Sequence, residues 1–296
     1  MSVITKVRTD EGVVGIGEGG TFPPFYGESV EGIKICIDRY LAAAIKGQDP
    51  LNIERILERM DASIYGNPGA KAAIEIAVWD IAGRSLGVPV YKLLGGLYRE
   101  EIPLYGFVWG GIGTAEEMGK VARELVEKGY KLLKMKVGID SKQDMKNYEA
   151  VKDAIGEKAE IRVDANGGYT SDIAIKTFKK MEDYGGLAIV EQPVSRWNLD
   201  GMAIVSRSLN TPVMADESVF TPEDAVRIVK KEAAGIMLIK LEKHGGIYNA
   251  KKIANIAGAA GIPLGLTSMM SSAGAAAAMH FAAATRNVVH LSLIHI

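Results

Sequence analysis

Short apolar runs alternate with longer amphipathic segments along the chain from about residue 102. The apolar runs have the length of strands and cover residues 102–108, 131–137, 161–164, 187–191, 213–216, 236–240 and 262–266. Between them, apolar residues recur at helical spacing over residues 115–128, 142–155, 171–184, 199–208, 222–231 and 247–260. Short strands that are each followed by a helix predict a parallel sheet with right-handed crossovers. Seven or eight such units most often close into a barrel.

An open doubly wound sheet is the alternative arrangement for the same alternation. Such a sheet normally carries a glycine-rich nucleotide-binding loop after its first strand. The loop that follows the first strand here, Gly110-Gly111-Ile112-Gly113, lacks the spacing of that motif. We therefore predict an α/β fold with a (β/α)7β TIM-like barrel, which is incomplete if the last strand is truncated.

The first hundred residues follow a different pattern. Residues 3–20 indicate a strand, a turn and a second strand, and helical spacing follows over residues 29–44, 53–63 and 70–86. We expect an N-terminal α+β capping domain at residues 1–100 and a catalytic barrel domain at residues 101–290. Residues 291–296 are expected to be either a truncated last strand or an artefact, and the chain a fragment shortened at both ends.

Composition narrows the class of protein. The chain has a net charge of −1 and 48% hydrophobic residues, without a basic patch or a charge run, so we expect neither nucleic acid nor a membrane surface as a partner. No apolar stretch is long and uncharged enough to span a bilayer. The single cysteine, Cys36, excludes a disulfide within the chain and favours a reducing, cytoplasmic location.

Polar side chains stand at the ends of these otherwise apolar strands. They are Lys134 and Lys136, Asp164 and Asn166, Glu191, Asp216 and Glu217, and Lys240. Successive members from Lys136 to Lys240 are 24 to 28 residues apart, which is close to the roughly 30 residues of one unit in a ~250-residue barrel. Each should therefore occupy the carboxyl end of its strand, where barrel enzymes place their catalytic groups.

Three of these residues predict a metal site. Asp164, Glu191 and Asp216 come from consecutive strands, so their carboxylates should converge. Hard oxygen ligands suit Mg²⁺, and no histidine or cysteine cluster favours zinc. A cation would also relieve the cost of burying three carboxylates together.

The lysines predict proton transfer. Lys134 and Lys136 are two positions apart on one strand, so their side chains should point the same way. Repulsion and burial should lower the pKa of one of them until it can act as a base near neutral pH. We expect Lys240, four strands further on, to face the other side of the metal. The α-carbon of a carboxylate substrate would then lie between two lysines, with the metal stabilising the ene-diolate.

From about Val3 to His290 the chain resembles the muconate lactonizing enzyme and mandelate racemase branch of the enolase superfamily. The resemblance is carried by GxGE at 15–18, KMKVG at 134–138, RVDANGGY at 162–169, VEQPVSRWNLDGM at 190–202, VMADES at 213–218 and IKLEKHGG at 239–246. It implies that Asp164, Glu191 and Asp216 bind Mg²⁺, with Mn²⁺ as an alternative. It also implies that Lys136 and Lys240 are the acid/base lysines. Lys134 would be the electrostatic neighbour of Lys136, and lysines on both faces match the muconate-type cycloisomerases.

One position departs from the cycloisomerase pattern. A glutamate that helps to bind or polarise the substrate carboxylate is replaced by Met270, and Ser271 or Ser272 would take its place as a hydrogen-bond donor. The resemblance further implies that loops of the capping domain select the substrate, which makes Phe25, Tyr26 and Tyr65 candidates. The remaining expectations are Trp109 in the pocket, Asn166 behind the metal ligands, Glu217 as a ligand or a partner of Lys240, and Lys243 and His244 in solvent.

Several reactions remain open for such a site. Racemisation or epimerisation of an amino-acid derivative and cycloisomerisation of a diacid start from the same enolate, and two lysines suit the first. The alternatives are a dehydratase acting on a hydroxy acid or hydroxyproline, and an inactive barrel that only binds. The expected partner is a small-molecule carboxylate, and the resemblance implies a homo-oligomer.

Overall fold

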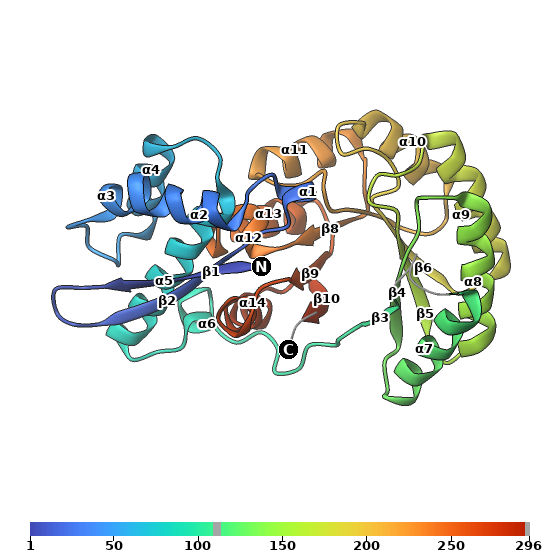
Figure 1. Ribbon diagram of the computed structural model, residues 1–296, viewed down its shortest axis with the longest axis horizontal. Coiled ribbons are helices and arrows are strands. Elements are labelled where there is room, and N and C mark those ends of the chain that lie inside the picture. Colours follow the sequence, from blue (N-terminus) through green and yellow to red (C-terminus); the bar gives the residue numbers. More distant parts are fainter. Residues whose placement is uncertain (109–113, 294–296) are drawn as a thin grey trace. The chain divides into compact units, whose positions relative to one another are not determined.

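The structure, a computed structural model, describes residues 1–108 and 114–293. They form two compact units, whose elements are labelled in Figure 1. The first unit contains Met1–Ile102, Ile239–Ile256 and Leu266–Ile296, and the second contains Pro103–Leu238 and Ala257–Gly265. The division into domains of residues 1–100 and 101–290, with 291–296 set apart, stays a prediction.

Parallel strands form most of the larger sheet. In sequence order β3 (Gly106–Val108), β4 (Leu132–Lys136), β5 (Glu160–Asp164), β6 (Leu187–Glu191), β7 (Val213–Ala215) and β8 (Ile236–Ile239) each pair with the next. With β9 (Leu264–Ser268) and β10 (Val288–Leu293) they make an eight-stranded sheet whose order follows the sequence. The predicted succession of parallel βα units is confirmed. The first strand begins later than expected, after Pro103, which has no N–H for a strand ladder.

Amphipathic helices follow these strands, as their spacing predicts. They are α7 (Ala115–Glu127), α8 (Ser141–Ile155), α9 (Ser171–Tyr184), α10 (Leu199–Ser208) and α11 (Pro222–Lys231). In Figure 1 helices α7 to α9 line one side of strands β3 to β6. The helix starts are fixed by side chains: Thr114 and Thr221 form capping boxes, and Asp140 and Thr170 accept hydrogen bonds from the first turn of their helices.

A glycine-rich hairpin begins the first unit. Strand β1 (Ser2–Arg8) pairs antiparallel with β2 (Val14–Gly20), and helix α5 (Pro68–Leu86) packs on β2. A Cβ atom at Gly15 or Gly17 would lie 2.0 Å from the carbonyl oxygen of Ala77 or Ala73 in that helix. The alternating glycines of the GxGE motif therefore let a helix approach the strand backbone closely. Glu18 follows Gly17 directly and is fully buried.

The remaining helices of the first unit complete its core. They are α1 (Pro23–Tyr26), α2 (Val30–Cys36), the π-helical turn η1 (Ile37–Leu41), α3 (Ala42–Ile45), α4 (Ile53–Ser63), α6 (Val90–Leu93), α12 (Leu241–His244), α13 (Ile247–Ala259) and α14 (Ser272–Ala284). The expected helix at residues 29–44 is thus interrupted by a π-turn. Its buried side chains Ile33, Cys36 and Leu41 pack with Met60 and Ile74 in one apolar cluster. No described helix has the length and apolar character needed to cross a membrane.

A buried carboxyl joins two helices within this unit. Glu75 of α5 accepts hydrogen bonds from the backbone N–H groups of Ile247 and Tyr248, at 2.8 and 2.7 Å, and from the indole of Trp79. It therefore satisfies the first turn of α13, whose N–H groups have no partner within the helix. Burial raises the pKa of Glu75 to about 7, although the three hydrogen bonds oppose that rise.

The raised pKa of Glu75 predicts a pH-dependent free energy of unfolding. The folded chain holds a proton on Glu75 that the unfolded chain loses between pH 4.5 and about 7. The contribution of this group is therefore full below pH 4.5 and falls as the pH rises through that window, by at most about 3 kcal/mol. We expect urea unfolding of the wild type and Glu75→Gln at pH 5 and pH 8 to show a shallower decline in the variant. Equal declines in the two proteins would contradict this assignment.

Candidate active site

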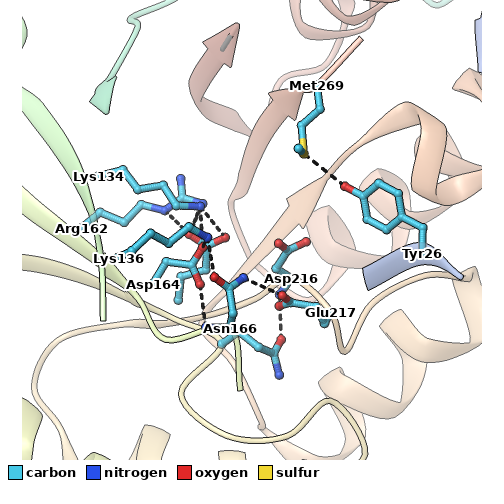
Figure 2. Close-up of polar contacts among 11 residues, drawn as sticks. Tyr26, Lys134, Lys136, Arg162, Asp164, Asn166, Asp216, Glu217 and Met269 are labelled. Atoms are coloured by element: carbon cyan, nitrogen blue, oxygen red, sulfur yellow. Dashed lines mark hydrogen bonds and ion pairs between the residues drawn. The ribbon is translucent and has the colours of Figure 1, made fainter. Parts of the chain in front are cut away.

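The strand register brings the predicted charges to one level of the sheet. Lys136 at the end of β4 pairs with Asp164 at the end of β5, and Asp164 pairs with Glu191 at the end of β6. Two residues earlier on the same strands, Lys134 pairs with Arg162. The regular spacing in the sequence therefore corresponds to neighbouring positions at the carboxyl ends of consecutive strands (Figure 2).

Lys134 is a buried cation between two buried carboxylates. Its Nζ lies 2.7 Å from Asp164 Oδ2 and 2.7 Å from Glu191 Oε2, and the side chain is 5% exposed. Burial alone would lower the pKa of Lys134, but the charges of Asp164 and Glu191 outweigh burial and raise it. We predicted a lowered pKa for one of Lys134 and Lys136; for Lys134 the shift is in the opposite direction, because two carboxylates lie against its ammonium.

Lys136 contacts the same carboxylate from the more open side. Its Nζ lies 2.6 Å from Asp164 Oδ2 and 2.5 Å from Asn166 Oδ1, and 29% of its side chain is exposed. The prediction that Lys134 and Lys136 point the same way is confirmed by their shared contact with Asp164. Burial would raise the pKa of Asp164, but the two lysines outweigh burial and lower it. Asp164 therefore stays ionised.

Asn166, which follows β5, links Lys136 at the end of β4 to Glu217 after β7. Its backbone N–H donates to Asp164 Oδ1 at 2.9 Å, and its amide nitrogen donates to Glu217 Oε1 at 2.7 Å. Its φ of +44° lies in the left-handed region, which asparagine tolerates better than most residues. Asn166 thus holds Lys136 and Glu217 through opposite ends of one amide (Figure 2).

Two residues with structural importance were not singled out from the sequence. Arg162 is fully buried, donates from Nε to Glu191 Oε2 at 2.8 Å and lies over the ring of Tyr105. Gln192 is also fully buried, and its Oε1 accepts from the backbone N–H of Asp216 at 3.0 Å and of Ser218 at 3.1 Å. Arg162 could have been found from the sequence as a charged residue inside an apolar strand. Gln192 could have been found as an amide directly after the predicted ligand Glu191.

The three carboxylates have the donor chemistry of a magnesium site. In this structure lysines hold Asp164 and Glu191, and the described residues include no group of three acidic, histidine or cysteine side chains arranged to hold a metal. The ammonium of Lys134 lies between Asp164 and Glu191, and the charge of Asp216 raises the pKa of Asp164. Carboxylate oxygens that together bind a positive charge have the chemistry that Mg²⁺ prefers. Asp164, Glu191 and Asp216 remain the predicted ligands.

The other predicted lysine lies in the first unit. Lys240 follows β8, is 8% exposed, and has its Nζ 5.7 Å from the centre of the Tyr26 ring. The Tyr26 hydroxyl donates to Met269 Sδ at 3.6 Å, as Figure 2 shows. Tyr26, predicted from the capping loop, is therefore a neighbour of Lys240. Lys243 and His244 were expected in solvent, which is wrong: they are 1% and 3% exposed because α12 folds them inward.

The other substrate-binding candidates are placed differently. Phe25 stacks on Phe22 at 5.1 Å, and Tyr65 is 98% exposed. Ser271 donates from both its N–H and its hydroxyl to Glu18, at 2.7 and 2.8 Å, so its donors already serve the start of α14. Met270 is 1% exposed. Trp109 lies outside the described residues.

Comparison with known proteins identifies the family. Residues 1–95 match the mandelate racemase / muconate lactonizing enzyme N-terminal domain, and residues 117–296 match the enolase C-terminal domain-like family. The chain is 39% identical over 293 residues to the L-Ala-D/L-Glu epimerase of Clostridium acetobutylicum, covering 98% of this chain and 81% of that protein. It is 37% identical over 282 residues to muconate cycloisomerase 1 of Pseudomonas putida, covering 94% and 75%.

A solved structure gives the same result. The crystal structure of the dipeptide epimerase from Enterococcus faecalis V583, complexed with Mg and the dipeptide L-Leu-L-Tyr, is similar with a TM-score of 0.93. It is 38% identical in sequence, and the similarity covers 99% of this chain and 82% of that one. The chain therefore belongs to the mandelate racemase/muconate lactonizing enzyme family of the enolase superfamily and has its (β/α)7β barrel fold with an N-terminal α+β domain.

Proposed function

We propose that this chain is a magnesium-dependent racemase or epimerase that exchanges the proton on the carbon next to a carboxylate of an amino-acid derivative. The relatives are named an epimerase and a cycloisomerase, and the chain is an enzyme of this isomerase class. The observation that carries the proposal is the placement of Lys136, whose ammonium meets Asp164 and Asn166 at the ends of neighbouring strands. Lys240 supplies a second amine after β8, four strands further in the sheet order.

In the proposed reaction the two lysines exchange one proton each with the substrate. Neutral Lys136 takes the α-proton at Nζ, and the electron pair of the C–H bond enters the carboxylate system as an enolate. The Lys240 ammonium then gives its proton to the other face of the α-carbon, which inverts the centre. Both lysines return to their starting states by exchange with water. Asn166 orients the Lys136 amine for this transfer.

A magnesium ion would be held by Asp164, Glu191 and Asp216. When bound, it would supply positive charge that stabilises the developing negative charge of the enolate. Lys134 is the group that would keep these carboxylates ionised and in place, because it contacts both Asp164 and Glu191. The Asn166 amide donates to Glu217 and would hold the Glu217 side chain in place next to Asp216.

A dipeptide is the substrate class that we propose. One relative is named an L-Ala-D/L-Glu epimerase, and a similar structure holds L-Leu-L-Tyr. The α-carbon next to the free carboxylate belongs to the C-terminal residue of a dipeptide, so that residue would be epimerised. Cycloisomerisation of a diacid is the second candidate, which the Pseudomonas putida relative supports. We further propose a reducing, cytoplasmic location, which the single buried cysteine supports, and a homo-oligomer, which only the family resemblance supports.

Incubation in deuterated water tests this function. With Mg²⁺ and L-Leu-L-Tyr, we expect deuterium at the tyrosine α-carbon and accumulation of L-Leu-D-Tyr, measured by proton NMR and chiral chromatography. Removal of the metal with EDTA should abolish both signals, and added Mg²⁺ should restore them. Lactone formation from muconate without α-exchange would favour the cycloisomerase, and a keto acid product from a hydroxy acid would indicate a dehydratase. Exchange that survives EDTA would contradict the metal dependence.

A further inference from the structure

Gln192 connects the end of β6 to the strands on both sides of it. It follows Glu191 directly and is fully buried. Its backbone N–H donates to the carbonyl oxygen of Met214 in β7 at 2.9 Å. Its own carbonyl oxygen accepts from the backbone N–H of Gly167, which follows β5, at 2.8 Å. The backbone of this one residue therefore joins the segments that carry the three predicted metal ligands.

The side-chain amide of Gln192 is fully used as well. Its Oε1 accepts from the backbone N–H groups of Asp216 at 3.0 Å and of Ser218 at 3.1 Å. Its Nε2 donates to the carbonyl oxygen of Val194 at 2.9 Å and to Ser218 Oγ at 2.8 Å. Both acceptor positions and both donor positions of the amide are thus occupied. A buried amide that is satisfied in this way has one orientation, and it holds the backbone groups that it contacts.

The strand ladder alone does not place Asp216 beside the other two carboxylates. Asp164 pairs with Glu191, and Glu191 pairs with Met214. Asp216 lies two residues beyond Met214, after β7 has ended and where the chain bends. Two residues of extended chain cover about 7 Å, so the position of Asp216 depends on contacts outside the ladder. The hydrogen bond from its N–H to Gln192 is such a contact.

We propose that Gln192 is a positioning residue for the metal site, because it fixes the backbone from which Asp216 would reach Mg²⁺ together with Asp164 and Glu191. This inference rests on the proposed function, in which these three carboxylates bind the ion. Mg²⁺ demands near-ideal octahedral geometry, so a displaced ligand weakens its binding. Loss of a group that orients a ligand typically lowers metal affinity by about 10- to 100-fold.

Metal titration of Gln192→Met tests this role. Methionine has a similar length, but it leaves the N–H groups of Asp216 and Ser218 without their acceptor. The dissociation constant of Mn²⁺, which suits the same oxygen ligands, is measured from the electron paramagnetic resonance signal of the free ion and by displacement with Mg²⁺. We expect it to rise about 10- to 100-fold. Circular dichroism verifies folding, and Gln192→Asn, whose amide is one carbon shorter, provides the same test if Gln192→Met does not fold.

A double-mutant cycle shows whether Gln192 acts through Asp216. Asp216→Asn removes the charge of the ligand but keeps the backbone N–H that donates to Gln192. In the Asp216→Asn background, Gln192→Met should therefore change Mn²⁺ affinity by less than about twofold. In an Asp164→Asn background the full loss should remain, because Asp216 is still present to be displaced. A general loosening of the fold would instead weaken Mn²⁺ binding in both backgrounds.

Ser218→Ala is the matched control within the same set of hydrogen bonds. It removes the hydroxyl that accepts from Gln192 Nε2 and leaves the hydrogen bond between Gln192 and Asp216, so Mn²⁺ affinity should stay close to that of the wild type. Unchanged affinity in Gln192→Met, an equal loss in Ser218→Ala, or a full loss in the Asp216→Asn background would overturn the role of Gln192 and leave the proposed function intact. Wild-type protein that binds neither Mn²⁺ nor Mg²⁺ would refute the metal dependence, and this inference with it.

Discussion

Replacement of Lys136 by alanine is expected to lower α-proton exchange of one dipeptide epimer by about 10²- to 10⁴-fold, the usual contribution of a general base. Lys136 is the amine held by Asp164 and Asn166 at the end of β4. Its loss should also stop net epimerisation, since inversion needs both lysines. Exchange of the other epimer should persist, because Lys240 can remove and return a proton on its own face. Lys240→Ala should show the opposite selectivity.

A lysine at the other end of the same strand provides the control. Lys131 precedes β4, is exposed, and is separated from the strand-end carboxylates by the length of that strand. Lys131→Ala should therefore leave exchange of both epimers within about twofold of the wild type, as for most surface substitutions. If Lys136→Ala slowed both epimers equally, the assignment of one lysine to each face would fail.

The second large effect concerns stability. In chelator-treated protein, Lys134→Met should lower the free energy of unfolding by about 3–5 kcal/mol, because it leaves buried Asp164 and Glu191 with less compensating charge. Added Mg²⁺ should recover part of this loss if the same carboxylates bind it, because a ligand that binds only the folded state stabilises it. Urea unfolding with and without Mg²⁺ measures both quantities.

Lys152 is a matched control for this substitution. It is also largely buried, with 9% of its side chain exposed, but its carboxylate partner Glu157 is 95% exposed. Removal of Lys152 leaves a carboxylate that water can solvate, so Lys152→Met should cost less than about 1 kcal/mol in lost ion pairing. A loss in Lys134→Met no greater than in Lys152→Met would show that the buried ion pairs are not needed for folding.

The sequence predicts the regular part of this molecule well, for a physical reason. Parallel strands of similar length repeat with their helices, so equal spacing in the sequence becomes equal height in the sheet. Lys136, Asp164 and Glu191 could be placed side by side from this argument alone, and their paired register confirms it. The apolar periodicity of the helices likewise gives their positions to within a few residues.

Features that depend on short or irregular segments could not be predicted in this way. Helix α12 has four residues, too few for a periodic pattern, so the burial of Glu242 and Lys243 left no signal in the sequence. The left-handed conformation of Gln192, with φ +39°, depends on hydrogen bonds to the following strand end. The sign of the Lys134 pKa shift depends on side-chain distances, and spacing gives neighbouring strand positions but not the 2.7 Å contacts of Lys134 with Asp164 and Glu191.

The contact between Glu18 and Ser271 joins positions 253 residues apart. On the ribosome, where synthesis runs at about 5–20 residues per second, Glu18 would wait roughly 10 to 50 s for its partner. The central stretch Pro103–Leu238 can begin to form its parallel strands during that interval. The hairpin β1–β2 can meanwhile pair and pack against α5, but the buried carboxyl of Glu18 lacks the donors of Ser271 and Gly274 until the end of the chain is made.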